Sequence, residues 1–269
     1  MTNLEFRTIT DEEVAFFDNI NTVCYQGVAG SYSYEVAQKY FGEKKIVSAE
    51  TFKDVFENVV GKTNGYVISN GVKDMYVRKQ VEKPAELQDK FVIVFTGRFS
   101  KEKSHTVLID AVEKSKYCDK IQLIFAGDGP LKEKLIEYSN KLTNKPIFKY
   151  FSRQDLVDTL NYADLYVHPA EIEIEAIACL EAIACGLVPI IANSPRCATK
   201  AFALGDKNLF ENLNSEDLAQ KIDYWIEHPQ QKQQCSNEYL GYVKQFSFDS
   251  CMNKMEQMLI ETVQKHKNK

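Results

Sequence analysis

The sequence predicts an α/β protein with a Rossmann-like, doubly wound parallel sheet, preceded by a small amino-terminal βαβα segment. Runs rich in β-branched and aromatic residues alternate along the chain with helical patterns, as in successive βαβ units. One run, residues 91–96 (FVIVFT), is apolar almost throughout, which is typical of a strand covered on both faces. We therefore expect helices on both sides of a parallel sheet.

The amino-terminal segment alternates strand and helix on a short repeat. Gly42 punctuates it, and Thr51 with Asp54 three residues later resembles a capping box. The elements expected are strand 22–25, helix 34–41, strand 45–47, helix 51–60 and strand 66–68. The stretch 73–90 is charged and contains Pro84, so we expect a linker or surface loop there.

The second segment carries clearer signals. The turn residues Gly127 and Gly186 punctuate it, and Ser152 with Asp155 forms a second capping-box pattern before a helix that ends at Tyr162. The expected strands are 91–96, 121–126, 146–150, 165–168 and 188–192. The other expected helices are 107–113, 131–142, 176–185, 216–227 and 249–266.

Composition narrows the class of protein. The chain has 269 residues, enough for one large domain or two ordinary ones, and 44% of them are hydrophobic. Its 33 Lys+Arg against 38 Asp+Glu give a net charge of −5, which argues against a general nucleic-acid binder. The seven cysteines form no CxxC pair, so we expect reduced thiols and no metal site.

No targeting or membrane signal stands out. The opening residues lack a basic and then apolar signal-peptide pattern, and the longest apolar run, 91–95, is far short of the ~20 residues that span a bilayer. We therefore expect a cytoplasmic protein, with at most peripheral contact at the inner face of a membrane.

Gly97, Arg98 and Lys103 directly follow the strand 91–96. In an open α/β sheet the ligand crevice lies at the carboxyl ends of the strands. Gly97 would let a ligand approach, and the two cations would suit a diphosphate. The alternative is that both cations belong to a solvated surface.

Four glutamates surround the loop and helix after the strand 165–168, namely Glu171, Glu173, Glu175 and Glu181. Free N–H groups at a helix start near Ala176 would form an anion site, and carboxylates are good acceptors for sugar hydroxyls. Apolar residues surround Glu181, an unusual setting for a solvated acid. For Glu171 and Glu175, the alternative is that they only favour the helix amino terminus.

Together these motifs resemble the carboxyl-terminal half of family-4 glycosyltransferases of the GT-B fold. The matching pieces are YVISNGV, IVFTGRFSKEKS, FAGDGPLKEKL and LNYADLYVHPAEIEIEAIACLEAIACGLVPIIANS, in the same order and spacing. The resemblance implies a nucleotide-diphosphate sugar as donor, no other cofactor, and retention of anomeric configuration.

The resemblance also implies residue roles. Arg98 and Lys103 would hold the diphosphate, and the backbone near Ala176 and Ile177 would meet the phosphates. Glu173 would bind the sugar hydroxyls as the catalytic carboxylate, and Glu181 would bind the ribose hydroxyls. The scattered histidines offer no convincing nucleophile or base, so catalysis would rest on electrostatics and positioning.

One departure from the family pattern concerns the phosphate site. Many relatives have Phe-Gly where this chain has Glu175-Ala176, which adds a carboxylate and a methyl group. The stretch EIEAIACLEAIACGLVP most resembles the corresponding sequence of bacterial enzymes that glucosylate diacylglycerol from UDP-glucose. This implies a role in glycolipid synthesis, with a lipid acceptor or a separate subunit that supplies the acceptor domain.

Residues 1–65 resemble a different family. The motifs YQGVAGSYS and TFKDVF match the opening of prephenate dehydratase, but the likeness stops near Gly65 and the family's Thr-Arg-Phe motif is missing. The chain therefore resembles a chimera of a dehydratase fragment, 1–65, and a donor-binding domain, 66–269. Three hypotheses follow: a glycosyltransferase, a nucleotide-sugar binding module or inactive fusion, and a relative of prephenate dehydratase.

Overall fold

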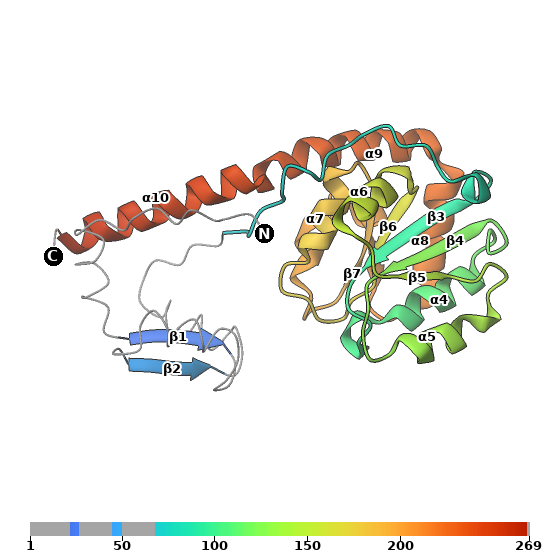
Figure 1. Cartoon of the computed structure of the whole chain (residues 1–269), viewed down its shortest axis with the longest axis horizontal. Coiled ribbons are helices and arrows are strands. Elements are labelled where there is room, and N and C mark those ends of the chain that lie inside the picture. The colour runs from blue at the N-terminus through green and yellow to red at the C-terminus, as the bar shows by residue number, and fades with distance from the viewer. Residues whose placement is uncertain (1–21, 27–44, 50–67, 268–269) are drawn as a thin grey trace. The chain divides into compact units, whose positions relative to one another are not determined.

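The computed structural model describes residues 22–26, 45–49 and 68–267. The chain divides into two compact units, one comprising Met1–Ile68 with Met255–Lys269 and the other comprising Ser69–Lys254. The second unit holds a six-stranded sheet, with helices on both of its sides (Figure 1).

All neighbouring strands of this sheet are parallel, and their order is β5-β4-β3-β6-β7-β8. The strands are β3 (Phe91–Thr96), β4 (Ile121–Ala126), β5 (Ile147–Lys149), β6 (Leu165–His168), β7 (Pro189–Asn193) and β8 (Leu209–Glu211). The chain winds outward from β3 to β5 and then returns to the other side of β3 to build β6, β7 and β8. This confirms the predicted doubly wound sheet and places its topological switch point between β3 and β6.

The helices are α4 (His105–Lys114), α5 (Lys132–Tyr138), α6 (Arg153–Tyr162), α7 (Ile177–Ala184), α8 (Ser215–Glu227), α9 (Pro229–Tyr242) and α10 (Phe248–Lys267). Helix α4 packs against α5 and α8, whereas α7 packs against α9. The sheet between them is covered on both faces, since every residue of β4 and of β6 is buried. This double coverage explains why the strands are apolar runs rather than alternating patterns.

Side-chain caps set the start of two helices. The Ser152 hydroxyl accepts a hydrogen bond from the N–H of Asp155 at 3.2 Å, which confirms the predicted cap of α6. The amide oxygen of Asn214 likewise accepts from the N–H of Asp217 at the start of α8. Each cap satisfies one of the N–H groups that a helix start leaves without a partner.

Two predicted elements differ from the structure. The expected helix 131–142 ends as an α-helix at Tyr138 and continues as a 3₁₀ turn, Ser139–Lys141. The Ser139 hydroxyl donates to the carbonyl oxygen of Ile136, which the next α-helical turn would otherwise use. Ile68, the described part of the expected strand 66–68, lies outside any strand, because the chain beside it bonds to Glu175 and to residues 246–248.

In the first unit, β1 (Thr22–Gln26) and β2 (Lys45–Ala49) form a parallel pair. Both strands lie at the predicted positions. The expected helices 34–41 and 51–60, and most of the motifs that resemble prephenate dehydratase, lie outside the described residues. Over the described ranges 22–26, 45–49 and 68–267, no helix is long and apolar enough to cross a membrane.

Candidate donor-sugar site

The loops that follow β3 and β6 meet at the carboxyl edge of the sheet, on either side of the switch point. The backbone N–H of Glu171 donates to the carbonyl oxygen of Glu102 over 2.9 Å. In an open α/β sheet, this is where a ligand crevice forms. Both groups of predicted site residues therefore belong to the same edge.

Close backbone packing holds the loop after β3 in place. The N–H of Phe99 donates to the carbonyl oxygen of Asp128 at 2.9 Å. A Cβ atom on Gly129 would lie 2.6 Å from the backbone N and O of Phe99, and one on Gly127 would lie 2.0 Å from the carbonyl oxygen of Gly97. The two glycines of the GDGP turn are thus required for this contact, which positions Gly97.

Lys103 and Glu173 form a half-buried ion pair across the switch point. Their side chains are 17% and 18% exposed, and the Lys103 ammonium donates to the Glu173 carboxylate. The N–H of Ile174 also donates to that carboxylate, at 3.0 Å. Burial opposes ionisation of Glu173, but the hydrogen bond and charge of Lys103 outweigh it and hold the pKa of this carboxyl below its usual range.

A buried histidine lies beside this pair. His168 ends β6, and its Nε2 lies 3.8 Å from the Glu173 carboxylate. Burial lowers the pKa of His168 to about 4, so the ring is neutral at pH 7. The imidazole packs edge to face against the ring of Phe95, with ring centroids 5.6 Å apart. Within the described chain, no group of three or more His, Cys, Asp and Glu side chains is arranged to hold a metal ion.

The start of α7 exposes backbone donors. Ala176 occupies the N-cap with φ 47° and ψ 62°, a left-handed conformation that favours glycine. The N–H groups of Ile177 and Ala178 have no protein acceptor among the described residues. The carboxylate of Glu175 is already hydrogen-bonded to Asn70. It accepts from the side-chain amide of Asn70 at 2.7 Å and from the backbone N–H of Asn70. The helix start is therefore an anion-binding position.

Glu181 lies further along α7 in an apolar setting. Burial raises the pKa of its carboxyl to about 7, while the Tyr76 hydroxyl and the charges of Lys73 and Arg153 favour the ionised form. Tyr76 is itself buried, and desolvation together with Glu181 raises its pKa to about 12. A carboxyl group poised near neutrality is typical of functional sites.

A cavity of 380 Å³ opens beside Gly97 and Arg98, at the carboxyl ends of β3, β4 and β5. Tyr150 and Phe151 line its wall, together with Arg153 at the start of α6. Tyr150 is 78% exposed, which is unusual for a large aromatic side chain. The cavity thus combines two cations with an aromatic wall.

The structure distributes the predicted residues as follows. Lys103 and Glu173 contact each other, Gly97 and Arg98 line the cavity, Ala176 and Ile177 begin α7, and Glu181 lies within that helix. Sequence reasoning missed the residues that complete the surroundings: His168, Tyr150, Phe151 and Arg153. The available signal was position, since each stands at or just after the end of a predicted strand.

The fold is the Rossmann-like half of the GT-B architecture, with cations and carboxylates gathered at its switch point. The chain belongs to the glycosyl transferases group 1 family, whose family model matches residues 77–239. It is therefore a glycosyltransferase by family. No curated protein sequence matches the chain significantly.

Solved structures agree with this assignment. The catalytic domain of the cholesterol-α-glucosyltransferase from Helicobacter pylori is 44% identical, with a TM-score of 0.57, over 58% of this chain and 99% of that domain. Anabaena HepE, solved with UDP and glucose, is 19% identical with a TM-score of 0.66, over 84% of this chain and 66% of that one. A glycosyltransferase from Rickettsia africae is 18% identical with a TM-score of 0.66, over 93% of this chain and 79% of that one. The last two likenesses show the fold alone.

Proposed function

We propose that the chain transfers a hexose, glucose, from a nucleotide-diphosphate sugar to the hydroxyl group of a lipid such as diacylglycerol, with retention of anomeric configuration. The observation that carries this proposal is the Lys103–Glu173 ion pair at the switch point of the sheet. It brings a phosphate-binding cation and a sugar-binding carboxylate together where an α/β sheet binds ligands.

The surroundings of the pair support a nucleotide-diphosphate sugar as donor. Arg98 and Lys103 supply the positive charge for the diphosphate, and the free N–H groups at the start of α7 add uncharged donors. Tyr150 and Phe151 offer a surface on which a nucleotide base can stack. The complexes of HepE with UDP-glucose show such a donor on the same fold.

In the proposed reaction, the bond from the anomeric carbon to the diphosphate oxygen breaks. The acceptor oxygen bonds to that carbon on the same face, and the acceptor proton passes to the departing phosphate oxygen. Arg98 and Lys103 stabilise the charge that develops on the leaving diphosphate, while Glu173 orients the sugar through its hydroxyl groups. Glu181 accepts hydrogen bonds from the ribose hydroxyls.

Exposed isoleucines beside Glu173 support an apolar acceptor. Ile172 and Ile174 are 41% and 58% exposed, whereas the alternating Glu171, Glu173 and Glu175 are held by Arg196, Lys103 and Asn70. The segment therefore turns its carboxylates inward and its apolar side chains outward at the donor edge. The Helicobacter pylori relative is a cholesterol-α-glucosyltransferase, and cholesterol is also a lipid.

The second candidate is a nucleotide-sugar binding module, or an inactive fusion, that binds the donor without transferring its sugar. The chain spans 66% of the HepE structure. The dehydratase-like origin of residues 1–65 stays a prediction, as does a cytoplasmic location at the inner face of a membrane.

Two measurements separate these functions. Calorimetry with UDP-glucose should show binding that Glu181→Ala weakens and that Glu137→Ala, a change on the exposed face of α5, leaves intact. Release of UDP in the presence of diacylglycerol vesicles would then support transfer, whereas binding without release would favour the module. Absence of binding at about 1 mM UDP-glucose would contradict both.

A further inference from the structure

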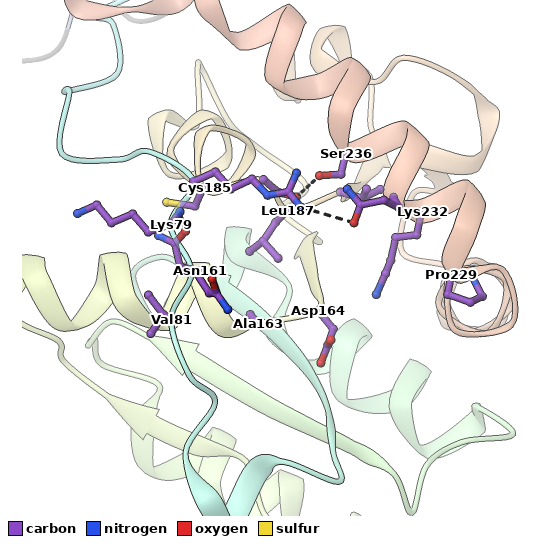
Figure 2. A pocket seen from close by; sticks show the side chains of 15 residues that line it. Lys79, Val81, Asn161, Ala163, Asp164, Cys185, Leu187, Pro229, Lys232 and Ser236 are labelled. Atoms are coloured by element: carbon purple, nitrogen blue, oxygen red, sulfur yellow. Dashed lines mark hydrogen bonds between the residues drawn. The ribbon is translucent and has the colours of Figure 1, made fainter.

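A second and larger cavity, of 540 Å³, lies at the opposite edge of the sheet from the donor site. Asp164 and Val188, which immediately precede β6 and β7, line it. Because the strands are parallel, the starts of β6 and β7 face away from the edge that holds Lys103 and Glu173. Helix α9 and the linker segment 78–81 form its remaining walls (Figure 2).

Positive charge dominates this cavity. Arg78 and Lys232 line it and Lys79 stands at its rim, whereas Asp164 is the only carboxylate among its lining residues. That carboxylate already accepts from the Lys83 ammonium at 2.7 Å and from the N–H of Val92 at 2.8 Å. Asp164 is therefore paired mainly with a residue outside the lining, and it offsets the charge of the cavity cations only in part.

Lys232 is the most telling of these cations. Its side chain extends from α9 into the cavity, on the side where Pro229 and Asp164 lie (Figure 2). The ammonium lies over the ring of Phe91, 4.5 Å from the ring centroid. Among the described residues, this ammonium has no carboxylate or carbonyl partner. Burial lowers the pKa of Lys232, so the protein loses free energy by placing the charge there. A partly buried ammonium that makes no hydrogen bond within the described chain favours the binding of an anion.

Arg78 is held in position to share such an anion. Its guanidinium donates to the side-chain oxygens of Asn237 and Gln233, at 3.3 and 3.5 Å. Its chain passes directly over Gly186, where a Cβ atom would approach the Arg78 Cδ to 3.1 Å. Two acceptors from α9 and a glycine beneath the side chain thus hold a second cation at this cavity, and preorganised cations favour phosphate.

We propose that this cavity binds a phosphate monoester with a small, non-aromatic body, such as a sugar phosphate. The charge of Arg78 and Lys232 selects the phosphate group. The remaining wall combines aliphatic residues with uncharged polar ones, and no aromatic residue is among the lining residues, in contrast to the donor site. The aliphatic residues include Val81, Ala163 and Leu187, and the polar ones are Gln80, Asn161, Gln233 and Ser236. A volume of 540 Å³ lies within the range of ordinary small-molecule sites.

The test is calorimetric titration of the full chain with glucose 6-phosphate in the presence of excess UDP, which would occupy the donor site. Lys232→Met should weaken binding at least about tenfold, as loss of one charged contact implies. Lys134→Gln, which removes an exposed cation of α5 far from both sites in the sequence, should leave the affinity unchanged. Glucose without the phosphate should not bind, and AMP should bind more weakly than glucose 6-phosphate.

The melting temperature of the same variants shows whether a loss of binding reflects a loss of folding. Because the Lys232 ammonium has no polar partner in the described chain, Lys232→Met should melt at or above the temperature of the unaltered protein. Arg78→Gln provides an independent second loss of binding. The proposal is overturned if glucose 6-phosphate fails to bind at about 10 mM, if Lys232→Met binds it as well as the unaltered chain, or if AMP binds more tightly. None of these outcomes depends on whether UDP-glucose is the donor.

Discussion

The Lys103 ammonium and the Glu173 carboxylate are in contact although 70 positions separate them in the sequence. The backbone of Glu173 is fixed as well, since its N–H donates to the carbonyl oxygen of Arg196 and its own carbonyl accepts from the N–H of Ala198. The carboxylate is therefore held on both sides before any ligand arrives. Such preorganisation is what electrostatic catalysis requires, because little reorganisation remains for the reaction itself.

Replacing Glu173 by Gln should separate catalysis from donor binding. Gln keeps the shape of the side chain but removes the charge that orients the sugar, so we expect kcat for UDP release to fall by about 100-fold. The affinity for UDP alone should change little, because UDP lacks the sugar. Steady-state kinetics and calorimetry measure the two quantities, and an equal loss of UDP affinity would show that Glu173 acts on the nucleotide instead.

Glu181 should make donor binding and stability depend on pH in opposite directions. Its pKa of about 7 means that the carboxylate, the better acceptor for ribose hydroxyls, forms as pH rises from 6 to 8. The affinity for UDP should therefore increase over this range, and Glu181→Gln should remove the increase. Calorimetry at several pH values tests this, and an unchanged slope in the variant would exclude Glu181 as its source.

The stability effect follows from the same raised pKa. The folded state holds the Glu181 proton more tightly than the unfolded chain, whose carboxyl titrates near 4.5. The resulting stabilisation is complete below that pH and is lost as pH rises through about 7, by up to about 3 kcal/mol. Urea unfolding at pH 5 and pH 8 should show this loss in the unaltered protein and a smaller one in Glu181→Gln.

The strands at the centre of the sheet were predictable because burial on both faces leaves a continuous apolar run. β3, β4 and β6 have the bounds that the sequence indicates. Helix α9 was not predictable in this way, since its sequence begins PQQKQQ and only Cys235, Ser236 and Tyr239 are buried. A helix without an apolar stripe carries little periodic signal.

The hydrogen-bonding and ion-pair partners of the glutamates could not be predicted from the neighbouring sequence. The spacing of Glu171, Glu173 and Glu175 suggests one cluster of acids, yet the structure gives each a different partner on a different loop. These contacts depend on which strands are neighbours in the sheet. The cavity beside Tyr150 is similar, because it exists only where the ends of three strands converge.

The left-handed Ala176 should be a position where glycine stabilises the protein. An L-residue in this conformation costs roughly 1–2 kcal/mol, whereas glycine adds about 0.4–1 kcal/mol of entropy to the unfolded chain. Ala176→Gly should therefore raise the free energy of unfolding by about 0.5–1 kcal/mol, measured by urea denaturation.

The matched control for that change is Ala178→Gly, two residues later in the first turn of α7. There the same substitution should lower the free energy of unfolding by about 1 kcal/mol. If both variants are destabilised alike, the left-handed conformation of Ala176 does not persist in solution.

The contact between the Gly127–Pro130 turn and the loop that follows β3 should be essential for the donor site. Ala at position 129 would place a methyl group 2.6 Å from the backbone of Phe99, so the loop that presents Gly97 and Arg98 must shift. Gly129→Ala should destabilise the protein by about 1–3 kcal/mol and weaken UDP binding at least about tenfold. Gly205→Ala is the matched control, because no atom lies within 4 Å of the added methyl group and its φ of −171° suits any residue. Thermal unfolding and calorimetry of the two variants test the contact, which is refuted if Gly129→Ala behaves like Gly205→Ala.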